Sequence, residues 1–374
     1  MTMSAGARRN AQRRREHAEA VPDHDPDAVH RFRSPDQPQP GLGRAVRTTT
    51  LPGTDVPTSA LGLGTAELFR MPSATDRLRM LFEAHNVGVR HFDTAPMYGL
   101  GLAESELGRF ARGRRDQLTI ATKFGIAPTR TGRALGRVQG PIRRLLAAAP
   151  ALRERARSSA TGPGVGPAGS LLYERSGYDA AAARRSLEAS LRALATDCVD
   201  LYLLHEPSGD DMRSADVRAW LEHARDAGMI RAWGVAGEPD LVGHVVDVLG
   251  PGTVRQVRED PFLRAGAVLD PTPRVTFGAL SRAMPRLVSL LGGGLWPDLR
   301  WADLDLDPGD RAGLARLLLR DALRGNPDGV LLLGTTDPGH LRVAAEVASM
   351  NPRNSAPDLD VLATALRTPA RRRT

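Results

Sequence analysis

Short apolar runs alternate with amphipathic helical patterns along most of this chain, and this alternation limits the possible folds more than any other feature. The runs end in glycine or a polar residue, and the stretches between them carry apolar residues three or four positions apart. Such alternation favours a parallel sheet covered by helices. Strands are predicted at 59–67, 87–93, 118–123, 198–205, 230–235, 253–257, 274–277 and 329–333. Helices are predicted from Thr75, at 103–111, after Asp179, and at 214–227, 239–249, 311–324 and 338–350.

The number of strands favours a closed sheet. About eight strands over about 290 residues fit the size of a (β/α)8 barrel. The alternative is an open doubly wound sheet, which calls for a glycine-rich fingerprint followed by an acidic residue about 20 positions later. Gly62 and Gly64 lack that continuation. We therefore predict an α/β fold, a (β/α)8 TIM barrel, preceded by a small β-hairpin around Pro52-Gly53.

The predicted barrel occupies residues 45–350. Residues 1–44 are rich in Arg, Asp, Pro and His, and we expect them to be disordered, as we do the basic C-terminal tail at 351–374. Gly, Pro and Arg interrupt the alternation at 126–178, which predicts a long loop insertion after the third strand, with a short helix near 141–149. In a barrel this insertion follows the face on which active sites form. A lid or specificity loop and a merely tolerated insertion both remain open.

Charge and cysteine content exclude several classes of protein. The net charge is +8, but residues 1–44 hold eight Arg against six acidic residues, and 367–374 hold four Arg. The excess therefore lies largely at the ends, which nearly lack aromatic residues, and no nucleic-acid partner is expected. No apolar run reaches the roughly 18 residues of a membrane span, and no apolar signal segment is evident. The single cysteine, Cys198, fits a reducing compartment. We expect a cytoplasmic protein with an inert, buried thiol.

A single lysine stands among the 51 basic residues: Lys123, at the end of a predicted strand. Arginine serves wherever a simple positive charge suffices, so the lysine is expected to do something that a guanidinium cannot. An ammonium whose pKa changes with its surroundings is such a group. The alternative is a compositional bias that left one lysine by chance.

Three predicted strands end in a reactive side chain, namely Asp93, Lys123 and His205, and Tyr98 follows the first of them. Because all strands of a barrel open at their carboxyl ends on one face, these four side chains can meet there. A phenol titrates at about 10, and a nearby ammonium lowers that pKa. Tyr98 can then act as a general acid in carbonyl reduction or as a base in alcohol oxidation. Such a site needs hydride from a cofactor.

The motifs around these residues resemble those of the aldo/keto reductase family, over about residues 45–350. They are Asp93-Thr-Ala-Pro-Met-Tyr98-Gly, Thr122-Lys123-Phe-Gly and Leu203-Leu-His205-Glu-Pro. The insertion after Lys123 and the run from Tyr178 to Leu191 look most like its bacterial aldose dehydrogenase-like branch. The resemblance implies an NAD(P)-dependent oxidoreductase acting on an aldehyde, ketone or sugar. It also implies that Asp93, Tyr98, Lys123 and His205 form the catalytic tetrad.

The resemblance further implies a site for NADP(H) or NAD(H). Gln256 matches a glutamine that binds the nicotinamide carboxamide, and Phe277 matches an aromatic residue that stacks on the nicotinamide ring. Gly64, Thr65 and Ala66 match the first-strand turn under the nicotinamide, and Gly334, Thr335, Thr336 and His340 match the loop and helix start that hold the adenosine phosphate.

Some positions depart from the family pattern. Ala236-Gly237 replaces the Ser-Asn that grips the carboxamide in many members. The basic residues that usually clasp a 2′-phosphate appear here as Gly334 and His340, so the choice between NADP(H) and NAD(H) stays open. The pair Glu259-Asp260 is also unusual, and the sequence offers no account of it.

Two other functions remain open. One is a non-catalytic barrel that binds a dinucleotide as a sensor or subunit, which the departures from the family pattern favour. The other is a Schiff-base aldolase that uses Lys123. A metal hydrolase is not favoured, because His91 and Asp93 are the only ligand-like pair, and no metal site is expected.

Overall fold

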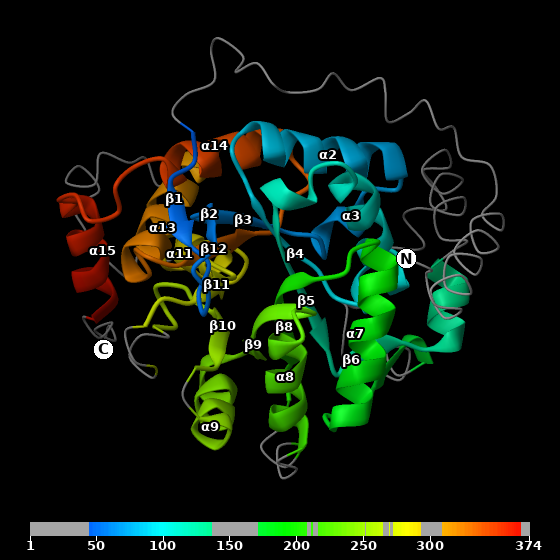
Figure 1. Cartoon of the computed structure of the whole chain (residues 1–374). Helices are drawn as coiled ribbons and strands as arrows, with labels where there is room; N and C mark the ends of the chain where they lie inside the picture. Colours follow the sequence, from blue (N-terminus) through cyan, green and yellow to red (C-terminus); the bar gives the residue numbers. More distant parts are fainter. Residues whose placement is uncertain are drawn as a thin grey trace, which may run out of the picture. The chain divides into compact units, whose positions relative to one another are not determined.

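The computed structural model describes residues 45–136, 171–207, 211, 216–250, 252–264, 269, 272–292 and 309–367. Within these ranges eight parallel strands close into a barrel, and Figure 1 shows helices lying around it. The predicted (β/α)8 barrel is thereby confirmed, and the open sheet is wrong. In order around the barrel the strands are β3 (Leu61–Gly64), β4 (His91–Asp93), β5 (Thr119–Phe124), β8 (Val199–His205), β9 (Ile230–Gly237), β10 (Val254–Arg258), β11 (Val275–Phe277) and β12 (Val330–Leu333).

Alternate residues of each strand fill the barrel interior, and small residues make room for large ones on neighbouring strands. Gly62 pairs with His91, and a Cβ added to this glycine would lie 2.9 Å from His91 Cδ2. Glycine is therefore required where the imidazole enters the interior. The same alternation turns Asp93, two residues after His91, toward the barrel mouth. The apolar part of the interior consists of Leu51, Ala121, Leu201, Leu203, Ala232, Ala236, Val254, Val275, Val330 and Leu332.

A hairpin closes the amino-terminal end of the barrel, as the sequence predicts. Strands β1 (Thr48–Thr50) and β2 (Pro57–Ser59) are antiparallel. Leu51 follows β1 and is fully buried in the barrel core, a burial that contributes about 1.5–3 kcal/mol. Gly53 has a φ of 78°, and a Cβ there would lie 2.3 Å from Val254 Cγ2. The turn therefore needs glycine both for its backbone conformation and for its close approach to β10.

The helices agree closely with the predicted ranges, and their caps explain where they begin. Asp179 caps its helix by accepting a hydrogen bond from Ala182 N. Ser73, rather than Thr75, caps the first helix, because its side chain accepts from Asp76 N. The predicted helices are α2 (Ala74–Asn86), α3 (Ala103–Ala111), α7 (Ala180–Leu194), α8 (Asp216–Asp226), α9 (Pro239–Leu249), α13 (Arg311–Gly325) and α14 (Pro338–Ala348).

Some helices among the described residues were not predicted, and one of them corrects the C-terminal boundary. Helix α15 (Pro357–Arg367) lies within the segment 351–374, which we expected to be a disordered tail. That prediction is wrong for the residues of this helix. Leu359 and Leu362 are buried against α13 and against α11 (Ala283–Gly292), which was also not predicted. The arginines around this helix led us to overlook its apolar face. No helix in the described ranges has the length and apolar character of a membrane span.

The long insertion is described at its two ends. Strand β6 (Ile126–Pro128) pairs antiparallel with β7 (Tyr173–Arg175), so the ends of the insertion form a two-stranded base. Residues 1–44 and 137–170, which include the predicted helix at 141–149, lie outside the described residues, as do 368–374.

Candidate active site

Reactive side chains stand at the carboxyl ends of three neighbouring barrel strands. Asp93 is the last residue of β4, Lys123 is the penultimate residue of β5, and His205 is the last residue of β8. Because β4 pairs with β5 and β5 pairs with β8, the three lie side by side at one mouth of the barrel. Tyr98 begins the short helix η3 (Tyr98–Gly101) in the loop after β4.

Lys123 lies at the centre of this group. Its Nζ donates to Asp93 Oδ1 at 2.6 Å and to the carbonyl oxygen of Thr94 at 2.9 Å. The same Nζ lies 4.8 Å from the centroid of the Tyr98 ring. The Tyr98 and His205 rings meet edge to face, with centroids 6.0 Å apart. The structure thus brings together all four residues expected to form the tetrad, and adds the Thr94 carbonyl, which the sequence did not indicate.

A tight turn places Tyr98 against Lys123. Gly99 and Leu100 both have positive φ, at 60° and 56°. A Cβ on Gly99 would lie 2.4 Å from the Phe69 ring, so this position requires glycine for space as well as conformation. Tyr98 N donates to Ala95 O at 3.1 Å and fixes the start of the turn.

Burial and charge set the protonation states of the group. Burial lowers the pKa of Lys123, but Asp93 and Tyr98 more than offset it, so the pKa is raised and the ammonium is kept. Burial raises the pKa of Tyr98, and the opposing charge of Lys123 only reduces that rise. The sequence led us to expect that the ammonium lowers the pKa of Tyr98, but burial outweighs the effect of the ammonium. Burial, with Lys123 and Arg175, lowers the pKa of His205 to about 3, so its imidazole is neutral.

The turn after β3 contacts this group directly. Thr65 N donates to the carbonyl oxygen of Asp93 at 2.9 Å, and Thr65 Oγ1 donates to Thr94 Oγ1 at 3.0 Å. Gly64 pairs with Asp93, and the nearest atom to a Cβ there would be Leu333 O at 3.7 Å. Ala66 is exposed. Gly64, Thr65 and Ala66 therefore line the mouth beside the carboxylate–ammonium pair.

Gln256 and Phe277 stand on the opposite strands of the same mouth. Gln256 is buried, and its Oε1 has no hydrogen-bond partner among the described residues. It lies beside Ala236 on β9 and Val275 on β11. Phe277, the last residue of β11, is half-buried and packs on the barrel core. These two residues suit a nicotinamide. Its carboxamide could donate a hydrogen bond to the unpaired Gln256 oxygen, and its ring could stack on the partly open ring of Phe277.

The loop after β12 leads into helix α14. Gly334 and His340 are exposed, Thr336 is half-buried, and Thr335 is buried with its Oγ1 accepting from Asp337 N at 3.1 Å. Asp337 caps α14, because its Oδ1 accepts from Gly339 N at 2.6 Å. This bond lowers the pKa of the exposed Asp337 carboxyl. The helix end that attracts an anion therefore already carries a negative charge of its own.

Ion pairs explain the unusual Glu259-Asp260. Asp260 is buried and accepts from Arg258 at 2.7 Å and from Phe262 N and Leu263 N. Glu259 is buried and pairs with Arg274 at 3.3 Å. Two buried carboxylates thus hold the chain that leaves β10 against neighbouring guanidinium groups.

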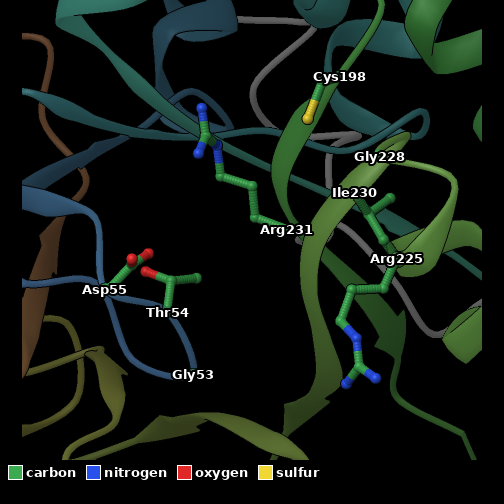
Figure 2. Close-up of a pocket in the computed structure, with 8 residues that line it drawn as sticks. All are labelled: Gly53, Thr54, Asp55, Cys198, Arg225, Gly228, Ile230 and Arg231. Carbon is green, nitrogen blue, oxygen red and sulfur yellow. The ribbon is translucent and has the colours of Figure 1, made fainter.

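A hollow of about 820 Å³ lies at the other end of the barrel (Figure 2). The hairpin turn at Gly53–Asp55 forms one side, and Cys198, Arg225 and Arg231 form the other. Arg231 pairs with Asp200 at 2.9 Å. Cys198 is half-buried rather than buried as expected. Burial nevertheless raises the pKa of its thiol, which agrees with an inert cysteine. Among the described residues no cluster of His, Cys, Asp or Glu suits a metal ion.

These features define a (β/α)8-barrel protein with a buried ammonium–carboxylate pair beside a phenol at the carboxyl face. The model of the aldo/keto reductase family matches residues 60–248, about half of the chain, and the protein belongs to that family.

Two curated relatives are matched over part of their length. A D-threo-aldose 1-dehydrogenase from Pseudomonas sp is 32% identical over 213 residues, covering 55% of this chain and 56% of that protein. A pyridoxal 4-dehydrogenase from Microbacterium luteolum is 38% identical over 97 residues, covering 25% of this chain and 28% of that protein. The chain therefore spans less than two thirds of either relative.

Solved structures share the fold over most of the chain. An aldo-keto reductase from Bacillus halodurans in its holo form has a TM-score of 0.61 at 19% identity, covering 86% of this chain and 96% of that one. An aldo-keto reductase from Klebsiella pneumoniae, solved in complex with NADPH, has a TM-score of 0.57 at 21% identity, covering 88% and 98%.

Proposed function

We propose that this protein is an NAD(P)-dependent oxidoreductase that moves a hydride between a nicotinamide and the carbon of a carbonyl or alcohol group. The observation that supports this most is the buried pair of Lys123 and Asp93, 2.6 Å apart, with the ammonium 4.8 Å from the Tyr98 ring. An ammonium held in place beside a phenol is suited to proton transfer at oxygen.

Tyr98 is the general acid in the direction of reduction. Its raised pKa keeps the phenol protonated at neutral pH, so it can donate to a carbonyl oxygen as that oxygen gains electron density. The Lys123 ammonium stabilises the phenolate that is left, and Asp93 keeps the ammonium in place. The neutral His205 beside Tyr98 orients the same carbonyl oxygen by a hydrogen bond. A bound nicotinamide would supply the hydride in reduction and accept it in oxidation.

The residues around the rest of the mouth would hold the dinucleotide. Gln256, whose Oε1 is unpaired, would accept a hydrogen bond from the carboxamide, and the half-buried Phe277 would stack on the nicotinamide ring. Ala236 is buried and stands where many members of the family have a serine that grips the carboxamide. Recognition of the carboxamide would therefore depend mostly on Gln256. The turn at Gly64, Thr65 and Ala66 would hold the nicotinamide end of the dinucleotide. Its adenosine end would be held by Gly334, Thr335, Thr336 and His340.

The substrate class is an aldehyde, a ketone or a sugar. The relatives are named for the oxidation of an aldose and of pyridoxal, which contain hemiacetal, aldehyde or alcohol carbons. The single cysteine is consistent with a cytoplasmic location. A Schiff-base aldolase is disfavoured, because it needs a neutral amine and the pKa of Lys123 is raised.

The decisive experiment is a spectrophotometric screen for oxidation or reduction of both dinucleotides with aldehydes, ketones and sugars. Tyr98→Phe should lower turnover by at least about 10²-fold, since general acid–base catalysis contributes this much. Dinucleotide affinity, followed by fluorescence titration, should be nearly unchanged. Retained turnover in this variant would remove Tyr98 from the mechanism. Dinucleotide binding without turnover of any substrate by the unmodified protein would instead favour the non-catalytic barrel.

A further inference from the structure

The returning end of the long insertion is bonded to the strand end that carries His205. Tyr178 is 4% exposed, and its hydroxyl donates to the backbone carbonyl of His205. Arg175, on β7, donates from Nη1 to the carbonyl of Glu206 at 3.0 Å. Ser176 N donates to Gly125 O at 2.9 Å, so the same limb is also tied to the end of β5.

The Tyr178 ring fits a space that only glycine leaves open. Gly125 follows Phe124 with a φ of 110°, and a Cβ there would lie 2.2 Å from Tyr178 Cε1. The ring also lies 5.8 Å from the Phe124 ring. Tyr178 is therefore packed between the end of β5, which carries Lys123, and the end of β8, which carries His205.

The backbone turn after His205 is held at three consecutive groups. The His205 carbonyl accepts from Tyr178, Glu206 N donates to Ala236 O at 2.8 Å, and the Glu206 carbonyl accepts from Arg175. Glu206 itself has a φ of 52°, an uncommon conformation for a residue with a side chain. Neighbouring bonds must maintain such a conformation, and two of the three come from the insertion.

The outgoing end of the insertion contacts the segment that carries Tyr98. A Cβ on Gly136 would lie 2.8 Å from Leu100 O, and one on Gly101 would lie 3.4 Å from Pro128 Cγ. Residues 130–136 are helical, and Thr129 N donates to Leu172 O at 2.9 Å, which joins the outgoing and returning limbs. The two limbs form one connected unit that contacts the turn following Tyr98, at Leu100 and Gly101, and the backbone of His205.

We propose that Tyr178 and Arg175 are positioning residues for His205, and that the ends of the insertion keep His205 aligned with Tyr98. Neither side chain is assigned a contact with substrate. Tyr178 acts through the His205 carbonyl, and Arg175 acts through the Glu206 carbonyl. This inference rests on the proposed role of His205 in orienting the reacting oxygen. It gives the two described ends of the insertion a supporting role in the site.

The test compares two buried tyrosines, Tyr178, which is bonded to the end of β8, and Tyr202, which lies within β8. Tyr178→Phe removes the hydroxyl bonded to the His205 carbonyl and keeps the ring. Tyr202→Phe is the matched control, since Tyr202 is fully buried on β8 and its hydroxyl donates to Ala183 O at 2.8 Å, toward α7. We expect Tyr178→Phe to lower kcat about tenfold with dinucleotide affinity unchanged, and Tyr202→Phe to leave kcat within about twofold of the unmodified enzyme.

A double-mutant cycle separates positioning from general loosening of the fold. In a His205→Ala background, Tyr178→Phe should have no further effect on kcat, because its effect passes through His205. Equal losses in both backgrounds, or a Tyr178→Phe variant that matches Tyr202→Phe, would overturn the proposal.

A second variant covers the case in which Tyr178→Phe does not fold. Arg175 has a side chain 59% exposed, so Arg175→Gln should fold, and it should lower kcat about threefold in the unmodified background only. Arg184→Gln, an exposed arginine on α7 paired with Glu188, is its control. If Arg175→Gln matches Arg184→Gln, the proposal is wrong. Tyr98→Phe tests the proposed function separately: its inactivity, together with unaffected Tyr178 and Arg175 variants, would reject only the positioning inference.

Discussion

Lys123 Nζ lies 2.6 Å from Asp93 Oδ1, and the two side chains are only 1% and 4% exposed. A pair buried to this degree has lost the hydration of both charges, so each partner depends on the other. The second carboxylate oxygen, Asp93 Oδ2, is buried without a hydrogen-bond partner among the described residues. Burying this pair therefore lowers the stability of the fold in return for an ammonium fixed at the barrel mouth. Such a costly arrangement is typical of a functional site.

Removal of the lysine charge should destabilise the fold. Lys123→Met leaves the Asp93 carboxylate buried and unpaired, and we expect the free energy of unfolding to fall by about 3–5 kcal/mol. Lys123→Arg keeps the charge, so its loss of stability should be smaller, but turnover should disappear because the larger guanidinium cannot occupy the ammonium position above Tyr98. Urea unfolding and turnover assays measure the two effects. A Lys123→Arg enzyme with normal rates would contradict the role given to the single lysine.

The pKa of Tyr98 predicts opposite pH dependences for the two directions of reaction. Because burial raises this pKa, the phenol stays protonated at neutral pH. Carbonyl reduction uses the protonated form, so its kcat should be level through neutral pH and fall only under alkaline conditions. Alcohol oxidation uses the phenolate, so its kcat should rise as the pH increases. Steady-state rates in both directions across a pH series test this. Parallel profiles in the two directions would show that another group transfers the proton.

The architecture was largely predictable because each strand and helix carries its own local signal. Helix α9 begins and ends where predicted, since Pro239 starts it and Gly250 follows its last residue. Helix α15 was missed because the arginine-rich composition around it masked the apolar face formed by Leu359 and Leu362. Local signals fail where a segment gains its stability from packing on distant elements.

The proximity of the reactive residues was also predictable, but their energetics and supports were not. Asp93, Lys123 and His205 end strands that follow one another around a barrel, so sequence order gives their neighbourhood. The rise in the pKa of Tyr98 depends on how burial compares with the nearby ammonium, which only the geometry shows. The bond from Tyr178 to the His205 carbonyl depends on the return path of the long insertion, for which the sequence contains no local signal.

Buried imidazoles should make the protein sensitive to acid. The pKa of His91 is lowered to about 3 by burial and by Lys123, that of His205 to about 3, and that of His85 to about 4, mainly by burial. In the unfolded chain a histidine takes up its proton at about 6.5. The unfolded state therefore binds more protons between about pH 6.5 and 3, and the free energy of unfolding falls as the pH is lowered through this window.

Each of these imidazoles should contribute up to about 1.4 kcal/mol per pH unit within that window. His91→Gln removes one of them from the barrel interior. Its free energy of unfolding should therefore depend less steeply on pH between about 6 and 4 than that of the unmodified protein, whatever its stability at neutral pH. Urea titrations at several pH values give both slopes, and equal slopes would mean that His91 is protonated in the folded state.

The Asp337 carboxylate should disfavour a dinucleotide with an additional phosphate near α14. Its Oδ1 accepts from Gly339 N at 2.6 Å, and its lowered pKa keeps it charged. The nearby His340 is exposed, with its Nε2 4.0 Å from Asp337 Oδ2. We therefore expect the protein to bind NADH more tightly than NADPH.

Asp337→Asn retains a good helix cap but removes the charge, so it should tighten binding of NADPH about threefold to tenfold and change NADH binding by less than twofold. Fluorescence titration of both reduced dinucleotides measures this without turnover. Equal changes for the two would show that Asp337 does not face the adenosine phosphate.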